Sequence, residues 1–211
     1  MLICAEDNEA RVVGIVASEL SFSHEVHTEV FYRFAVSCER LSENKDTILV
    51  TVSERLLDKL EFSVGSRIEV IGQFRSYNNY SGVGNKLVLT LFAKSIRIAY
   101  DDEMCENEIY LNGYICKPVV YRVTPFGREI ADLLVAVNRA YNKSDYIPCI
   151  AWGRNAKYVS SLDVGTNIKI RGRMQSREYQ KRVSNEEVIT KTAYEVSVSN
   201  LETVKQETKM I

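Results

Sequence analysis

The sequence predicts an all-β protein built from two tandem copies of a small five-stranded barrel, each with one short helix between its third and fourth strands. Three observations support this. The two halves of the chain match each other at an offset of about 99 residues. Apolar residues alternate with polar ones in short runs, which is the period of a half-buried strand. Only two short segments have helical character.

The first strands of each copy begin after an Asn-Glu pair. Asn8-Glu9 precedes an apolar run at 13–16, and Asn107-Glu108 precedes a similar run at 112–115. The next repeated strands show strict alternation of apolar residues and end near an arginine. Their apolar positions are Phe34, Val36 and Cys38 in the first copy and Leu133, Val135 and Val137 in the second.

The predicted helices, at 54–60 and 155–161, each stop before a Val-Gly pair, which is a plausible helix ending. The strand that follows is Val64–Gly72 in the first copy and Val164–Gly172 in the second. Its final glycine lies within apolar alternation, which predicts a bulge or a sharp bend. In the last strands, Leu89, Leu91 and Ala93 correspond to Tyr194, Val196 and Val198.

Five strands with one helix between the third and fourth are typical of the OB-fold, a barrel that binds oligonucleotides across one face. We therefore expect two tandem OB-folds. The predicted boundaries are a diverged OB-fold at 1–100, an acidic linker at 101–106, a binding OB-fold at 107–203 and a short C-terminal tail at 204–211.

Bulk composition, with 45% hydrophobic and 26% charged residues, is that of an ordinary globular protein. The N-terminus lacks the basic and apolar regions of a signal peptide, and no apolar run is long enough to span a membrane, so we expect a cytoplasmic protein. The five cysteines form no C-x-x-C pair, which argues against a zinc site or a disulfide framework. Cys38 and Cys149 are expected in the core.

Positive charge is concentrated in the second copy. Residues 1–100 hold 11 Lys and Arg against 13 Asp and Glu, whereas residues 107–182 hold 13 against 6. A polyanionic partner for the second copy is the natural physical interpretation.

The segment 146–157 contains the only tryptophan. Alternation along a strand directs Tyr146, Ile150 and Trp152 to one face, with the two rings about 20 Å apart. Ile147, Cys149 and Ala151 then face the core, and Arg154 and Lys157 follow. Flat rings beside cations suit unpaired bases and their phosphates.

The second copy, over about residues 107–202, resembles the bacterial single-stranded DNA-binding protein family. The motifs that carry the resemblance are 107–113, Pro118, 122–127, 136–139, 146–153, 172–179 and 192–196. The resemblance implies base stacking on Tyr141, Tyr146, Trp152 and Tyr179. It also implies phosphate contacts from Arg122, Arg128, Arg139, Arg154, Arg173 and Arg177. Members of the family usually end in an acidic tail, whereas this sequence ends in a short segment that is not acidic.

The first copy departs from this pattern. Ser53 stands for Trp152 and Thr47 for Tyr146, the position of Tyr141 is non-aromatic near Leu41, and only Tyr77 or Tyr80 could replace Tyr179. We therefore expect the second copy to bind. The first copy is expected to be structural, to make oligomer contacts or to extend the binding path weakly.

The predicted function is non-sequence-specific binding and protection of single-stranded DNA in replication, recombination or repair. A homodimer would supply the four OB-folds that family members commonly assemble. Two alternatives remain open, an RNA-binding protein and a protein-interaction module that serves as a replication accessory. Each ring could instead be a packing or turn residue, and each arginine an ordinary solvated side chain.

No enzyme, cofactor, metal, membrane or small-molecule substrate is predicted. His24 and His27 lack a third ligand, and residues 101–103 have the composition of a solvated linker. No phosphate-binding G-x-x-x-x-G-K-[ST] run occurs.

Overall fold

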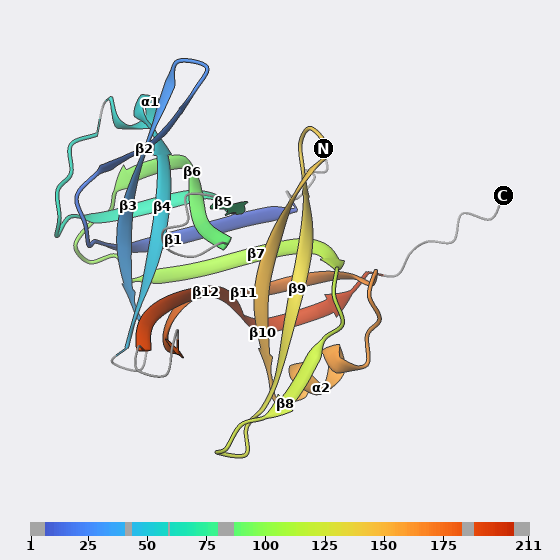
Figure 1. Ribbon diagram of the computed structural model, residues 1–211. Helices are drawn as coiled ribbons and strands as arrows, with labels where there is room; N and C mark the ends of the chain where they lie inside the picture. Colours follow the sequence, from blue (N-terminus) through green and yellow to red (C-terminus); the bar gives the residue numbers. More distant parts are fainter. Residues whose placement is uncertain (1–6, 41–43, 59, 80–86, 183–187, 205–211) are drawn as a thin grey trace. The chain divides into compact units, whose positions relative to one another are not determined.

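The computed structural model describes residues 7–40, 44–58, 60–79, 87–182 and 188–204. The described part contains two closed β-barrels (Figure 1). The first barrel consists of β1 (Asn8–Val16), β2 (Ser21–Val26), β3 (Glu29–Glu39), β4 (Lys45–Ser53), α1 (Glu54–Leu57), β5 (Arg67–Asn78) and β6 (Leu87–Ile98). The second consists of β7 (Glu106–Ile115), β8 (Val120–Val123), β9 (Glu129–Arg139), β10 (Lys143–Trp152), α2 (Arg154–Ser160), β11 (Asn167–Arg182) and β12 (Val188–Thr203).

Strand pairing in the two barrels is the same. In the first, β3 pairs antiparallel with β4, β4 parallel with β6, β6 antiparallel with β5, and β5 with β1, which closes on β3. The second repeats this arrangement with β9, β10, β12, β11 and β7. The predicted all-β class and the tandem OB-folds are therefore confirmed. Each barrel also has an extra short strand, β2 or β8, that the sequence did not predict.

The repeated glycines occupy equivalent places in the two barrels. Gly65 and Gly165 have φ values of 94° and 93°, a backbone region that favours glycine. Gly72 lies at a register shift between β5 and β6, as predicted. A Cβ on Gly72 would lie 2.0 Å from the Phe92 carbonyl oxygen, and one on Gly172 would lie 2.2 Å from that of Ser197. Glycine is therefore needed where these strands approach a neighbour most closely.

Each barrel has its own apolar core, formed by the inward side of its strands. The largest fully buried side chains of the first include Phe34, Ile48, Ile68, Phe74 and Leu91. Those of the second include Leu111, Ile115, Ile147, Ile168 and Ile170. Cys38 and Cys149 are buried, as expected. The helices are shorter or shifted relative to the predicted segments, at Glu54–Leu57 and Arg154–Ser160.

The chain divides into two compact units whose limits differ from those of the barrels. The first unit comprises 9–108 and 174–195, and the second comprises 1–8, 109–173 and 196–211. Within the first unit, the Ser176 N–H donates to Asp46 Oδ1 at 3.2 Å, and the Thr47 N–H donates to Ser176 Oγ at 3.0 Å. The far half of the β11–β12 hairpin thus packs on the end of β4. The predicted domain boundaries stay a prediction.

Within the described residues, no helix is long and apolar enough to cross a membrane. The same residues include no group of three or more His, Cys, Asp or Glu placed to hold a metal ion. Residues 205–211 of the predicted tail and Tyr80 lie outside the described residues, whereas the Val204 N–H donates to the Asn167 carbonyl oxygen at 2.9 Å.

Candidate nucleic-acid interface

Strand β10 presents two aromatic side chains to solvent, as alternation predicts. Tyr146 is 48% exposed and Trp152 is 39% exposed, while Ile147, Cys149 and Ala151 on the other side are buried. Ile150 shares the face of the rings but is only 4% exposed. It lies in the middle of the sheet, opposite Asp132 of β9 and Ser197 of β12, where neighbouring side chains cover it.

Tyr141 lies in the turn between β9 and β10 and is 93% exposed. Tyr141 and Asn142 have φ values of 63° and 53°, in the left-handed region. Such values suit asparagine and are unusual for a bulky tyrosine. The turn therefore holds the ring in solvent, in the same compact unit as Tyr146 and Trp152.

Tyr179 differs from the other three predicted rings. It lies on β11 within the segment 174–195, which belongs to the first unit. Its side chain is outside the described part of the structure. The structure thus brings three of the four predicted stacking residues into one unit.

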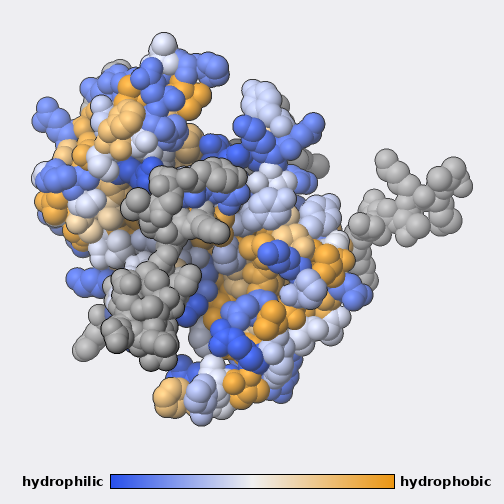
Figure 2. Space-filling model, viewed as in Figure 1, coloured by the Kyte–Doolittle hydropathy of each residue, from blue (hydrophilic) through white to orange (hydrophobic). Residues whose placement is uncertain are grey.

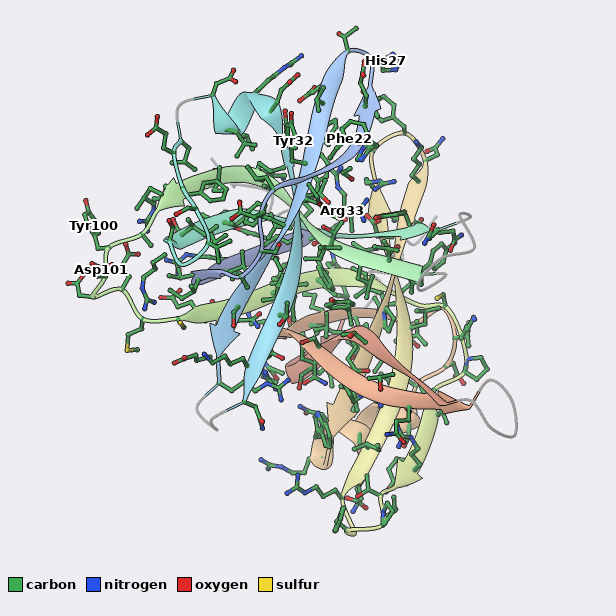
Figure 3. All side chains as sticks on the ribbon, turned by 60° about the vertical axis from the view of Figure 1, so that its left-hand side comes forward. Phe22, His27, Tyr32, Arg33, Tyr100 and Asp101 are labelled. Carbon is green, nitrogen blue, oxygen red and sulfur yellow. The ribbon has the colours of Figure 1, made fainter. Side chains whose placement is uncertain are left out.

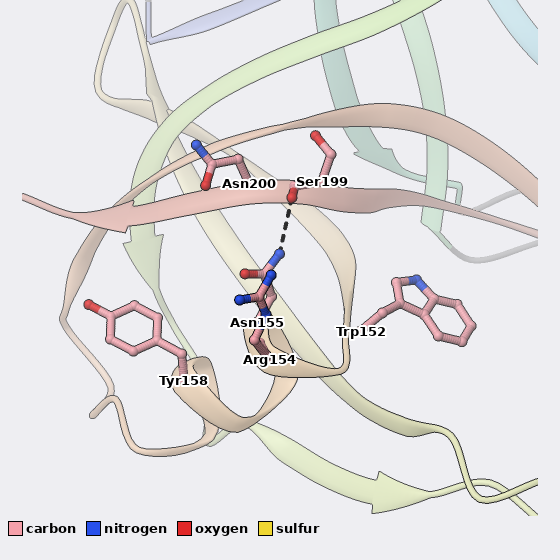
Figure 4. A pocket seen from close by; sticks show the side chains of 6 residues that line it. All are labelled: Trp152, Arg154, Asn155, Tyr158, Ser199 and Asn200. Carbon is pink, nitrogen blue, oxygen red and sulfur yellow. Dashed lines mark hydrogen bonds between the residues drawn. The ribbon is translucent and has the colours of Figure 1, made fainter.

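A pocket of about 500 Å³ opens beside Trp152. Trp152 lies on one side of it and Tyr158 of α2 on the other (Figure 4). Between them, Asn155 Nδ2 donates to the Ser199 carbonyl oxygen of β12 at 3.1 Å, which fixes the start of α2 against the sheet. The pocket is also lined by Arg154, Ser199 and Asn200, so a cation and several hydrogen-bonding groups lie next to an indole ring.

The six predicted arginines fall into distinct electrostatic environments. Arg122 pairs with Asp132 at 2.8 Å, Arg139 with Asp145 at 3.4 Å and Arg177 with Glu195 at 3.5 Å. A carboxylate next to a guanidinium offsets part of the charge that a phosphate would meet. Arg128 and Arg154 are exposed and make no ion pair with any described residue. Arg173 is partly exposed and has interactions of its own.

A hairpin formed by β8 and β9 extends the apolar surface beyond the predicted site. Phe126 in its turn is 91% exposed, and Val120 and Val123 are each 58% exposed. Figure 2 shows hydrophobic side chains over this hairpin at the lower end of the view. The turn is well defined, because the Gly127 N–H donates to the Thr124 carbonyl oxygen at 2.9 Å.

Hydrogen bonds to Glu129 hold the hairpin against α2. The Tyr121 hydroxyl donates to Glu129 Oε1 at 2.8 Å, and Lys157 Nζ lies 3.0 Å from the same oxygen. These contacts, that of Lys157 first, lower the pKa of Glu129, and the carboxylate in turn raises the pKa of Lys157 and of Tyr121. Lys157, predicted as part of the basic surface, therefore serves to anchor β9 to α2.

Sequence reasoning missed Phe126 and the pocket residues Asn155, Tyr158 and Ser199. Phe126 carried a usable signal, because an aromatic residue within a Pro-Phe-Gly turn has no core to enter. Asn155 and Ser199 are 44 residues apart in sequence, so their contact depends on the packing of α2 against β12.

The second barrel thus combines exposed rings on its outer face with two exposed arginines, Arg128 and Arg154, that make no ion pair with any described residue. The family model described as "Single-strand binding protein family" matches residues 106–204. The second barrel is therefore similar to the single-strand binding protein family.

Individual relatives show the same similarity. The chain is 32% identical over 103 residues to single-stranded DNA-binding protein A of Bacillus subtilis, which covers 46% of this chain and 59% of that protein. It is 33% identical over 97 residues to the single-stranded DNA-binding protein of Bacillus cereus, covering 41% and 57%. The chain thus spans less than two thirds of the length of these relatives.

The solved structure of the single-stranded DNA-binding protein from Thermus aquaticus is similar over 97% of this chain and 96% of that one. Its TM-score is 0.71 at 18% sequence identity, so this likeness concerns the fold.

Proposed function

We propose that this protein binds single-stranded DNA without sequence specificity, through base stacking on the second barrel and phosphate contacts from nearby arginines. The observation that carries the proposal is the pair of exposed rings on β10, Tyr146 and Trp152. Beside Trp152 lies Arg154, which makes no ion pair within the described part of the chain. Every base has a flat face, so such rings accept any sequence. Tyr141 and Tyr179 are proposed as further stacking residues.

Phosphate contacts should depend on which cations are free. Arg128 and Arg154 are the strongest candidates, because no described carboxylate pairs with them. Arg122, Arg139 and Arg177 share their charge with an acidic neighbour and should contribute less. The logarithm of the affinity should fall with the logarithm of salt concentration with a slope of about −0.7 for each phosphate contacted on a single strand.

The test is a binding titration with fluorescein-labelled oligo-dT of about 30 nucleotides, followed by fluorescence anisotropy at several salt concentrations. That length serves two OB-folds at up to about 16 nucleotides each. We expect binding that weakens as salt is added. Unlabelled duplex DNA of equal length should displace the labelled oligo-dT only poorly. Failure to bind oligo-dT at moderate salt would contradict the proposal and favour a protein-interaction module.

The Arg154→Ala variant refines this test. It should reduce the salt slope by about 0.7, the contribution of one phosphate contact. Lys169→Ala is the matched control, because Lys169 is a half-buried cation of β11 that already pairs with the Glu202 carboxylate at 3.9 Å. Its slope should match that of the unmodified protein. Equal slopes for all three proteins would remove Arg154 from the phosphate contacts.

Competition between oligo-dT and oligo-rU of equal length separates DNA from RNA, since stacking alone does not distinguish them. We expect oligo-dT to compete more strongly. Replication, recombination and repair in the cytoplasm are the proposed settings, because each exposes single-stranded DNA. A homodimer with four OB-folds is the proposed assembly, and a monomer by light scattering during size-exclusion chromatography would contradict it.

A further inference from the structure

The first barrel has rings and cations on the face where the second barrel has Trp152, but at different positions. In the second barrel, Trp152 of β10, Ile130 of β9 and Arg122 of β8 lie opposite one another in one row across the sheet. The corresponding row of the first barrel is Ser53 of β4, Phe31 of β3 and His24 of β2. In this row, the rings of the first barrel therefore lie on β3 and β2, one and two strands away from β4, which carries Ser53.

These aromatic residues form a continuous platform within the first unit. The His24 and Phe31 rings are stacked, with centroids 4.8 Å apart and planes 8° from parallel. Phe31 contacts Phe92 of β6 at 5.6 Å, and the Arg75 guanidinium covers the Phe92 ring at 3.8 Å. Phe31 is only 8% exposed, whereas His24 on top of it is exposed. Buried Phe31 and half-buried Phe92 thus support an outer layer formed by an imidazole and a guanidinium.

The next row of the same face carries a cation where the second barrel has a carboxylate. Arg33 lies opposite Thr51 and Ser21, in the place that Asp132 occupies between Ile150 and Val120. The Arg33 side chain donates to Ser23 Oγ from Nε at 3.2 Å and from Nη2 at 2.9 Å.

Arg33 also lies near an accessible ring. Its guanidinium carbon is 5.9 Å from the centroid of Tyr77 of β5, which is 39% exposed. Arg33 makes no ion pair with any residue of the described part. Figure 3 labels Arg33 on β3, together with Tyr32 of the same strand and Phe22 of the neighbouring strand β2.

Acidic side chains on this side of β3 lie at its two ends, and both are paired. Glu29 accepts a hydrogen bond from the Ser53 hydroxyl at 2.5 Å and lies 3.7 Å from Arg55. Glu39 lies 3.1 Å from Lys45. The centre of the face is therefore positive although the first copy as a whole is acidic, and this local charge complements a phosphodiester chain.

We propose that the first barrel has a single-stranded DNA site of its own, in which Arg33 and Arg75 contact phosphates while His24 and Tyr77 offer ring faces to bases. This inference rests on the proposed function, because it assumes that the ligand of the second barrel continues over the first. Apart from Tyr77, which could correspond to Tyr179, it assigns binding to residues that do not correspond to the rings of the second barrel. The chain would then cover a longer stretch of DNA than one OB-fold can.

The test compares two readouts in the full chain. A short oligo-dT of about eight nucleotides, which one OB-fold can hold, reports on the second barrel through Trp152 fluorescence. Reverse titration with poly-dT gives the number of nucleotides covered per protein at saturation. The double variant Arg33→Gln, Arg75→Gln should cover roughly half as many nucleotides, while its affinity for the short oligonucleotide is unchanged.

The matched control is the double variant Lys45→Gln, Arg55→Gln, which removes the same charge from side chains that lie beside Glu39 and Glu29, at the two ends of β3. It should keep the full site size. An unchanged site size in the Arg33, Arg75 variant would overturn the inference. If that variant does not fold, Tyr77→Ser replaces it, because Tyr77 is partly exposed and should be removable without unfolding.

The two proposals fail in different ways. If the short oligonucleotide does not quench Trp152 fluorescence in the unmodified protein, the proposed function of the second barrel is contradicted. Normal quenching together with a site size that neither the Arg33, Arg75 variant nor Tyr77→Ser alters would contradict only the site on the first barrel.

Discussion

Replacing Trp152 with alanine should weaken binding of single-stranded DNA by about one stacking interaction and leave the fold intact. Trp152 exposes 39% of its surface. A tryptophan side chain provides up to about 250 Å², so a base could cover about 100 Å² of it. At about 25 cal/mol per Å² this corresponds to about 2.5 kcal/mol. That value lies within the roughly 1–3 kcal/mol measured for base–aromatic stacking.

The dissociation constant of Trp152→Ala should therefore rise about 60-fold, since about 1.4 kcal/mol corresponds to a factor of ten. The assay is fluorescence anisotropy of labelled oligo-dT, because this variant has no tryptophan of its own. Trp152→Phe should recover most of the affinity by restoring a ring. Tyr100→Ala is the control, because Tyr100 is 76% exposed but lies in the segment between the barrels' strands.

Two results would refute this reasoning. Affinity within about twofold of the unmodified protein would remove Trp152 from the interface. A large drop in melting temperature would indicate that the indole mainly packs against the protein, because the loss of a core aromatic typically costs about 3–5 kcal/mol.

Three further predictions concern the hairpin, the barrel and its ion pairs. Phe126→Ala should weaken oligo-dT binding by up to one stacking interaction, about 1–3 kcal/mol, without changing the melting temperature. Unchanged binding together with a lower melting temperature would assign Phe126 to packing. Gly172→Ala should destabilise the second barrel by about 1–3 kcal/mol in urea unfolding, because its Cβ would lie 2.2 Å from the Ser197 carbonyl oxygen, and an unchanged midpoint would contradict that close approach. The Arg97 guanidinium, more than any other neighbour, lowers the pKa of Glu103 from 4.5 to about 2. A lowered pKa stabilises the fold above pH 4.5, and this stabilisation is lost as the pH falls toward 2. Glu103→Gln should therefore flatten the pH dependence of the urea midpoint between these pH values.

The repeat made most of the fold predictable. Gly72 and Gly172 were expected at a bulge or bend, and both lie where a Cβ would meet a neighbouring strand. The extra strands β2 and β8 were not predicted because their side chains are almost all exposed on both faces. Without a buried side, a short strand shows no alternation of apolar and polar residues.

The candidate site was predictable in its rings and less so in its charges. Alternation alone gave the exposure of Tyr146 and Trp152. The pairing of Arg122 with Asp132 depends on which residues of β8 and β9 lie opposite one another, and this register is set by the turn between them. The grouping of 174–195 with the first unit depends on contacts such as that of Ser176 with Asp46, 130 residues away in the sequence.

The fluorescence of Trp152 tests the central claim most directly, because it is the only tryptophan and lies on the proposed stacking face. Titration of the unmodified protein with oligo-dT should quench this emission strongly, and added salt should restore it as the DNA dissociates. Emission that stays unchanged while anisotropy shows the oligonucleotide to be fully bound would contradict the assignment of base stacking to Trp152.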